Sequence, residues 1–139
     1  MRLAILADIH ANRQAFAACL DAARDKGAER YICLGDIVGY GADPEWSLDR
    51  VMAMADDGAL VVRGNHDNAI GSTAETMNAE AQAAIEWTRG RLSAPQRQYL
   101  AGLPMTLEED GRLYVHADAS NPSRWRYVRC GASHGNPCR

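Results

Sequence analysis

The chain has 139 residues, of which 47% are hydrophobic and 24% are charged, and its formal net charge is −3. This length suits one domain with a single core, and the composition is that of a globular protein, which excludes an intrinsically disordered chain. The small negative charge excludes the broad basic surface by which proteins bind nucleic acid or anionic membranes.

The apolar N-terminal run, residues 1–7, is too short for the hydrophobic part of a signal peptide and for a membrane span. We therefore expect a soluble, cytoplasmic protein. Cysteine thiols stay reduced in the cytosol, so we expect Cys19 and Cys33 to be small buried side chains and not disulfide partners.

The first part of the chain has the pattern of a βαβ unit. Residues 2–7 are typical of a buried strand, Asn12 is a candidate N-cap for a helix that extends to about Lys26, and residues 31–34 form the next apolar run. A strand, a helix and a strand in this order predict two parallel strands joined by a right-handed crossover.

The chain beyond residue 40 predicts three more helices, a third strand and a hairpin. Asp43 and Pro44 have the order typical of a helix N-cap and first helical residue. Two short strand patterns on either side of the acidic turn at Asp110-Gly111 are typical of a β-hairpin. The expected elements are a helix to about residue 57, a strand over 59–62, a helix over 78–90, a short helix after residue 93, and hairpin arms over 105–108 and 112–115.

Polar side chains follow directly after four of the expected strands. Residues i and i+2 of a strand point the same way, so Asp8 and His10 can converge just beyond the edge of the sheet. Because neighbouring parallel strands end at a common edge, polar groups from several strand ends should meet there. The group consists of Asp8, His10, Asp36, Asn65, His66 and His116.

These residue types can form a metal centre with a proton donor beside it. Carboxylate and imidazole ligands together suit Mn²⁺, Fe or Zn²⁺ better than Ca²⁺. Asp36 has two oxygens and could bridge two cations, and such a pair, about 3.5–4 Å apart, can share a phosphoryl group and generate hydroxide. His66 would lie beside the ligands, free to protonate a leaving oxygen. Taken singly, each residue more often serves as a cap or a surface group, but three of the four histidines follow strands directly.

Four motifs, in this order, resemble those of the calcineurin-like metallophosphoesterase superfamily. They are Asp8-Ile9-His10, Gly35-Asp36-Ile37-Val38-Gly39-Tyr40, Gly64-Asn65-His66-Asp67 and Val115-His116-Ala117. The intervening Gly41-Ala42-Asp43-Pro44 and the run from Ala117-Asp118 to Tyr127-Val128 resemble its small prokaryotic phosphodiesterase branch. The match extends over nearly all of residues 2–128.

The resemblance implies an α/β fold, a two-sheet sandwich flanked by helices in the order α/β/β/α, with a dinuclear metal centre at the strand ends. By motif position, it implies a first cation bound by Asp8 and His10, a second bound by Asn65 and His116, and a bridge formed by Asp36. The implied cofactor is a pair of divalent cations, with Mn, Fe, Zn and Ni all compatible with these ligands.

The activity that the resemblance implies is hydrolysis of a small phosphate mono- or diester. A metal-bridging hydroxide would attack phosphorus in line, and His66 would be the catalytic acid or transition-state donor. The second motif of the protein-phosphatase branch, G-D-x-x-D-R-G, carries an Asp that orients the catalytic His and an Arg that holds phosphate. This chain has Gly39 and Tyr40 at those positions, so a protein phosphatase is the less favoured assignment.

Two further residues near these motifs have alternative interpretations. Asp67 could orient His66 in place of the absent aspartate, or it could cap a helix. Arg63 could reach phosphate, or it could pair on the surface.

The resemblance ends near Arg129. The late G-H-x-H motif of the family supplies one histidine to each cation, whereas this chain has His134 alone after His116. We therefore predict an incomplete metallophosphoesterase-like domain over residues 1–128 and an irregular tail over 129–139.

The loss of two ligands and of the strands that carry them predicts weak metal retention and low activity. A sheet left partly uncovered also predicts aggregation or homo-oligomer formation. Two alternative functions follow: a non-catalytic scaffold that binds a partner through the uncovered sheet, and a fragment with no independent role.

Overall fold

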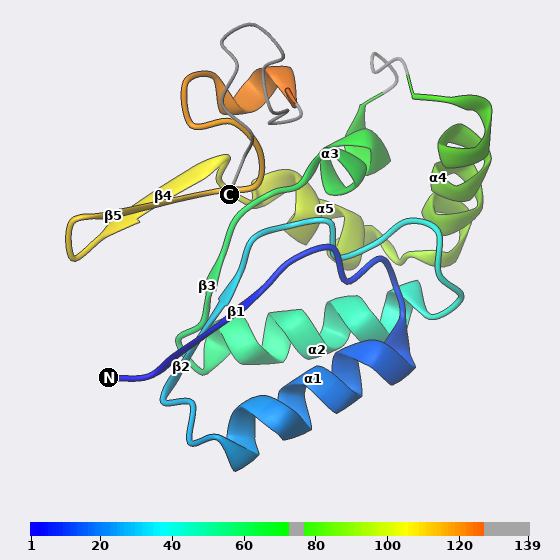
Figure 1. Ribbon diagram of the computed structural model, residues 1–139. Helices are drawn as coiled ribbons and strands as arrows, with labels where there is room; N and C mark the ends of the chain where they lie inside the picture. Colours follow the sequence, from blue (N-terminus) through cyan, green and yellow to red (C-terminus); the bar gives the residue numbers. More distant parts are fainter. Residues whose placement is uncertain (73–76, 127–139) are drawn as a thin grey trace, which may run out of the picture.

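The computed structural model describes residues 1–72 and 77–126, in which a parallel sheet and a small antiparallel sheet are flanked by helices (Figure 1). The parallel sheet has the order β1–β2–β3, with bounds Leu3–Leu6, Arg30–Cys33 and Leu60–Val61. The antiparallel sheet is a hairpin of β4 (Thr106–Glu109) and β5 (Arg112–Val115). The predicted α/β class, with two sheets flanked by helices, is confirmed, as are the parallel βαβ unit and the hairpin.

The helices begin where the sequence places capping residues. Their bounds are α1 Arg13–Asp25, α2 Pro44–Asp56, α3 Asn65–Gly71, α4 Ala79–Arg91 and α5 Ala94–Gly102, followed by a 3-10 turn, η1, at Pro122–Arg124. The Asn12 side chain accepts a hydrogen bond from the Ala15 N–H at 3.0 Å, so it caps α1 as expected. Ser93 starts α5 through a capping box with Gln96.

The motif Gly64-Asn65-His66-Asp67 forms the start of the helix α3. Gly64 is the N-cap of α3, and the Asp67 carboxylate accepts the Gly64 N–H at 3.0 Å. This bond closes the first helical turn, as the carboxylate of a capping box does. Asn65 and His66 therefore lie on a short helix and not in an irregular loop.

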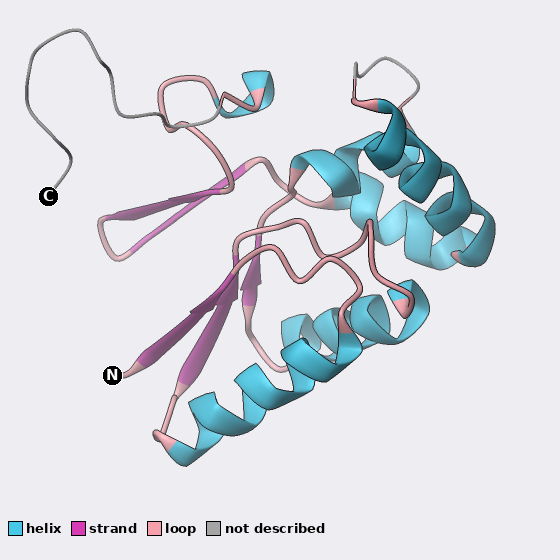
Figure 2. Ribbon diagram, turned by 45° about the vertical axis from the view of Figure 1, so that its right-hand side comes forward, coloured by secondary structure: helices cyan, strands magenta, loops and turns pink. Residues whose placement is uncertain are grey.

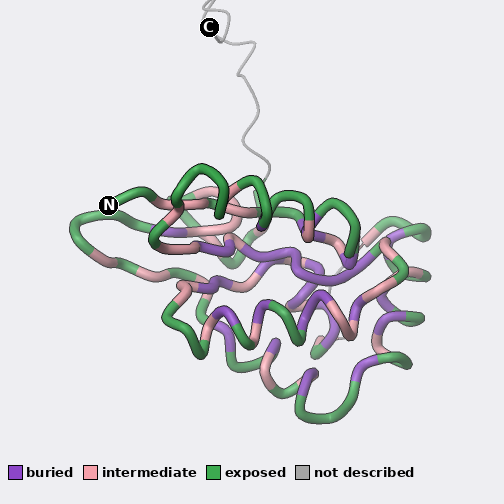
Figure 3. Tube along the Cα trace, turned by 90° about the horizontal axis from the view of Figure 1, so that it is seen from below, coloured by how far each residue is buried: buried purple, intermediate pink, exposed green. Residues whose placement is uncertain are grey.

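Alternate strand residues point to opposite sides of the parallel sheet; helices cover one face, and the hairpin covers part of the other (Figure 2). On one face Cys33 and Val61 join the core formed with α1 and α2. On the other face Ile32 and Val62 pack against Tyr114 of the hairpin. The buried positions run along the middle of the molecule, while the outer sides of the helices are exposed (Figure 3).

The two cysteines that were expected to be buried differ in their exposure. Cys33 is buried as expected, but Cys19 is exposed, so that expectation was wrong. Periodicity places Cys19 near the apolar stripe of α1 without saying where the sheet beneath it ends. Ile5, on the edge strand β1, is also exposed, at 56% of its full surface.

A bidentate ion pair fixes the hairpin to the parallel sheet. The Arg30 guanidinium of β2 contacts the two carboxylate oxygens of Glu109 in β4 at 2.7 and 2.8 Å. This fork geometry holds the two groups in one orientation. Because His116 directly follows β5, the ion pair also helps to place that histidine.

The predicted tail over 129–139 lies outside the described residues. Within the described ranges, no helix combines the length and apolar character needed to cross a bilayer.

Gly35, between β2 and Asp36, lies close to the backbone of Gly64, and substitution of this glycine tests whether that close approach contributes to stability. Gly35 and Gly58 have nearly the same backbone, with φ of +91° and +93°. A Cβ at Gly35 would lie under 3.0 Å from backbone atoms of Gly64, whereas a Cβ at Gly58 has nothing within 4 Å. We expect Gly58→Ala to lower the free energy of unfolding by about 1–2 kcal/mol, the penalty for a left-handed alanine.

Gly35→Ala should lower the free energy of unfolding by more than about 3 kcal/mol, since two backbones must also separate. Urea unfolding of the two variants beside the wild type measures both values. Equal losses for the two variants would show that the close approach of these backbones contributes nothing.

Candidate metal centre

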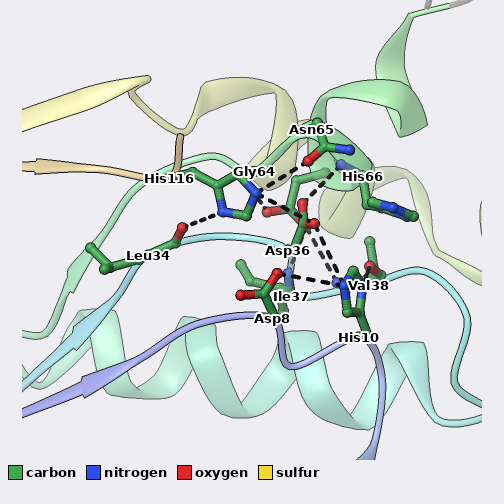
Figure 4. A network of polar contacts seen from close by, with 11 residues as sticks. Asp8, His10, Leu34, Asp36, Ile37, Val38, Gly64, Asn65, His66 and His116 are labelled. Carbon is green, nitrogen blue, oxygen red and sulfur yellow. Dashed lines mark hydrogen bonds and ion pairs between the residues drawn. The ribbon is translucent and has the colours of Figure 1, made fainter. Parts of the chain in front are cut away.

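The polar residues singled out in the sequence lie together at the C-terminal ends of the strands (Figure 4). They follow β1, β2, β3 and β5 in turn, and β3 leads directly into α3. The six residues are Asp8, His10, Asp36, Asn65, His66 and His116. The structure thus brings all six into one neighbourhood, while their roles as ligands and donor stay a prediction.

Two overlapping groups of ligand atoms have the compactness of metal sites. In one group, His10, Asp36 and His66 each place a ligand atom within 4.8 Å of the others. In the second group, Asp8, Asp36 and His116 do the same. Asp36 belongs to both groups, so its carboxylate lies where a bridging ligand would.

Asp36 is buried, with 3% of its surface exposed, and polar groups surround its carboxylate. Oδ1 accepts the backbone N–H of His66 at 2.9 Å, and Oδ2 lies 3.4 Å from His116 Nε2 and 3.6 Å from His10 Nε2. Burial by itself would raise the pKa of Asp36, but the hydrogen bond and charge of His116 and the His66 N–H lower it below its ordinary value. The carboxylate is therefore ionised at neutral pH.

His116 is held at both ring nitrogens. Nδ1 donates to the Leu34 carbonyl at 2.7 Å, while Nε2 lies 3.1 Å from Asn65 Oδ1 and 3.4 Å from the Asp36 carboxylate. Burial alone would lower the pKa of His116, but the hydrogen bond and charge of Asp36 raise it from 6.5 to about 9. In the metal-free protein this imidazole is thus the counter-charge of Asp36.

His10 is oriented in the same manner. Its Nδ1 lies 3.2 Å from the Val38 carbonyl, which turns Nε2 toward the carboxylates of Asp36 and Asp8, at 3.6 and 3.7 Å. The Asp8 side chain is 62% exposed and forms the outer rim of the cluster.

His66 is buried beside the cluster and contacts two aromatic rings. Its centroid lies 4.7 Å from those of both His10 and Tyr40. Within the part of the chain that the structure describes, its Nδ1 makes no hydrogen bond. Burial lowers the pKa of His66, with Asp36 opposing the shift, so the ring is neutral at neutral pH and keeps one N–H to donate.

The backbone around these residues is unusual. Asp8, His10, Ala11, Asp36 and Tyr40 all have positive φ, between 47° and 61°. Non-glycine residues seldom adopt this conformation, and it concentrates at functional sites where surrounding contacts impose it. The strand-end loops are thus shaped to present these side chains.

The structure decides between the interpretations left open for Asp67 and Arg63. Asp67 does not hydrogen-bond the His66 ring: its Oδ1 accepts the N–H of Ile37 at 2.9 Å and of Val38 at 3.3 Å, and its Oδ2 caps α3 through the Gly64 N–H. Burial, with the charge of Asp36, raises the pKa of Asp67 to about 6.

Arg63 turns away from the cluster. Its guanidinium donates to the Ala101 and Leu103 carbonyls at 2.5 and 2.6 Å and to Asn68 Oδ1 at 3.1 Å. It therefore fixes the end of α5 and does not point toward a phosphate.

Sequence reasoning missed two aromatic residues that flank the cluster. The Tyr40 ring, half exposed, lies against His10 and His66, and Trp125 lies 6.1 Å from the His116 ring. In the sequence, Tyr40 was noted only because it stands where the protein-phosphatase motif has its Arg, next to the Gly39 that replaces the Asp. Trp125 has no local pattern that would have revealed its position. A cavity of about 620 Å³ opens beside Asp8, His10 and Tyr40.

Comparisons with known proteins agree with this geometry. The family described as the calcineurin-like phosphoesterase superfamily domain matches residues 1–137. The uncharacterised protein MJ0912 of Methanocaldococcus jannaschii is 33% identical over 132 residues, which cover 91% of this chain and 53% of that protein.

Two crystal structures share the fold. A metallophosphoesterase from Sphaerobacter thermophilus superposes with a TM-score of 0.76 at 36% identity, covering 92% of this chain and 51% of that one. The hypothetical protein PH1004 from Pyrococcus horikoshii OT3 superposes with a TM-score of 0.76 at 26% identity, covering 86% and 56%. The chain spans about half the length of these proteins. With the family match extending over nearly all of its residues, this chain belongs to the calcineurin-like phosphoesterase superfamily.

Proposed function

We propose that the domain hydrolyses a phosphate mono- or diester with two divalent cations held around Asp36. The observation that carries this proposal is the position of the Asp36 carboxylate, which belongs to both compact ligand groups. The superfamily consists of phosphoesterase hydrolases, so the reaction class agrees with the family. We propose a small phosphate ester as the substrate and the cytoplasm as the location of the protein.

The donor set fits such cations. His10 and His116 each engage a backbone carbonyl through Nδ1, which leaves Nε2 facing Asp36. Metal-ligating histidines commonly have this arrangement, because the outer hydrogen bond fixes the tautomer and the ring orientation. Mixed carboxylate, imidazole and amide ligands are compatible with Mn²⁺, Fe, Zn²⁺ or Ni²⁺.

Each residue of the cluster has a proposed role, either as a cation ligand or as a hydrogen-bond donor. By motif position, Asp8 and His10 would hold one cation, Asn65 and His116 the other, and Asp36 both. The compact groups instead combine His10 with His66 and Asp8 with His116, so the support that they give is for the shared position of Asp36. When bound, such cations polarise phosphoryl oxygens and lower the pKa of water. The neutral His66 ring would donate its N–H to the leaving oxygen as negative charge develops there.

The first prediction concerns turnover. The wild type should hydrolyse bis-p-nitrophenyl phosphate when Mn²⁺ is added, and Asp36→Asn should lose both turnover and cation binding because it removes the shared carboxylate. His66→Gln should keep cation binding and lose about 10²- to 10³-fold in kcat, the usual contribution of a hydrogen-bond donor aimed at developing negative charge. Release of p-nitrophenol and titration calorimetry with Mn²⁺ measure the two quantities.

Asp21→Asn is the matched control, since this exposed carboxylate pairs with Arg24 on α1, and it should behave as the wild type. If His66→Gln loses a cation as Asp36→Asn does, His66 is a ligand and not the donor. Metal-independent binding of a partner by a wild type without hydrolysis would instead support a scaffold.

The second prediction concerns pH. Because the His116 pKa is raised from 6.5 to about 9, a cation must displace its proton, and Mn²⁺ affinity should rise up to about tenfold per pH unit as the pH increases toward 9. In the metal-free protein the ion pair with Asp36 stabilises the fold fully below pH 6.5, and this contribution should be lost as pH rises through about 9.

Calorimetry at pH 7.5 in buffers of different ionisation enthalpy counts the released protons. The wild type should release about one proton on binding, and His116→Gln should release none from this position. Equal proton release by both proteins would contradict a protonated His116.

A further inference from the structure

Two carboxylates cross-link the segment after β2, residues 35–38, to the segment after β3, residues 63–67, which includes the first turn of α3; these segments are called the first and the second loop. Figure 4 shows the contact between Asp36 and the backbone of His66. Asp36, in the first loop, accepts the backbone N–H of His66 in the second at 2.9 Å. Asp67, in the second loop, accepts the backbone N–H groups of Ile37 and Val38 in the first at 2.9 and 3.3 Å. Each loop therefore supplies a carboxylate that accepts hydrogen bonds from the backbone of the other loop.

One oxygen of the Asp67 carboxylate makes this cross-link, and the other caps α3. Its side chain is 1% exposed, and its second oxygen accepts the Gly64 N–H at 3.0 Å. Buried N–H groups left without a partner are strongly unfavourable, so the two loops cannot separate without breaking this set of bonds. Asp67 thus holds three buried donors from both loops around one carboxylate.

The backbone that Asp67 holds carries groups of the candidate metal centre. Ile37 directly follows Asp36, and the Val38 carbonyl contacts His10 Nδ1 at 3.2 Å. Gly64 directly precedes Asn65 and His66. A shift of either loop would move the Asp36 oxygens relative to the imidazoles on both sides, although Asp67 belongs to neither compact ligand group.

We propose that Asp67 is a positioning residue that sets the spacing between Asp36 and the groups on α3, and thereby the affinity of the site for its cations. The inference rests on the proposed function, because it requires cations at this centre. Outer-shell partners of metal ligands typically contribute about 10- to 100-fold in affinity.

Asp67→Asn tests the proposal with almost no change in side-chain volume. An amide has one acceptor and one donor group, so its NH₂ must face either Gly64 or the Ile37–Val38 backbone, and one loop is released. We expect Mn²⁺ affinity, measured by calorimetry, to fall about 10- to 100-fold. Saturating Mn²⁺ should restore most of kcat for Asp67→Asn but not for Asp36→Asn, with KM near the wild-type value.

Val51→Ala is the control for stability alone. Val51 is buried in α2, at 1% exposure, and belongs to the core beneath the sheet and not to the loops. It should lower the melting temperature and leave Mn²⁺ affinity unchanged. If Asp67→Asn fails to fold, Asp67→Ser replaces it. The hydrogen of its hydroxyl can rotate away from the backbone N–H groups, whereas the NH₂ of the amide cannot.

Wild-type Mn²⁺ affinity in the folded Asp67 variant would overturn the proposal and reduce Asp67 to a structural cap of α3. A wild type that binds no Mn²⁺ would instead overturn the proposed function itself. The two failures are therefore distinguishable in the same set of titrations.

Discussion

The buried carboxylate of Asp36 is the constraint on which the other features of this domain depend. An ionised group removed from water needs compensating charge and hydrogen bonds, and Asp36 obtains them from His116 and from the His66 backbone. The elements that compensate it come from the hairpin and from α3, so folding brings β2, β3 and β5 to one point. In the metal-free protein His116 supplies the positive charge, and in the proposed function cations would take over that role. The same electrostatic requirement therefore serves the fold and the chemistry.

The strand-end loops around Asp36 have an uncommon backbone. Left-handed residues in sparsely populated backbone regions are unfavourable by about 1–3 kcal/mol each, and here they cluster around Asp36. The contacts around this backbone are the close approach of Gly35 to Gly64, the carbonyls that hold His10 and His116, and the reciprocal carboxylates of Asp36 and Asp67. The proposed ligands are thus held in place in part by groups outside the proposed ligand set, namely the Val38 and Leu34 carbonyls and the Asp67 carboxylate.

Local sequence patterns predicted the elements well. Asn12 and Ser93 begin helices because their side chains satisfy the free N–H groups of the first turn, a requirement that involves only the next three residues. The hairpin around Asp110-Gly111 has the same local character. Cys19 was misplaced because helical periodicity identifies a stripe but not the extent of the sheet that covers it. Arg63 had two interpretations, and the carbonyls of α5 that decide between them lie almost forty residues away in the chain.

By itself, the sequence determined the order of strands and helices apart from α3, and the chemical types of the side chains at the strand ends. It also led to the expectation that six of these side chains gather at one edge: Asp8, His10, Asp36, Asn65, His66 and His116. These features depend on short-range periodicity and on the rule that neighbouring parallel strands end together. Only the tertiary structure decided which ring nitrogens face Asp36, why the pKa of His116 rises while that of His66 falls, and that Asp67 joins two loops. Such properties depend on burial and on distances between segments far apart in the chain, and a hydrogen bond across that separation leaves no periodic trace in the sequence.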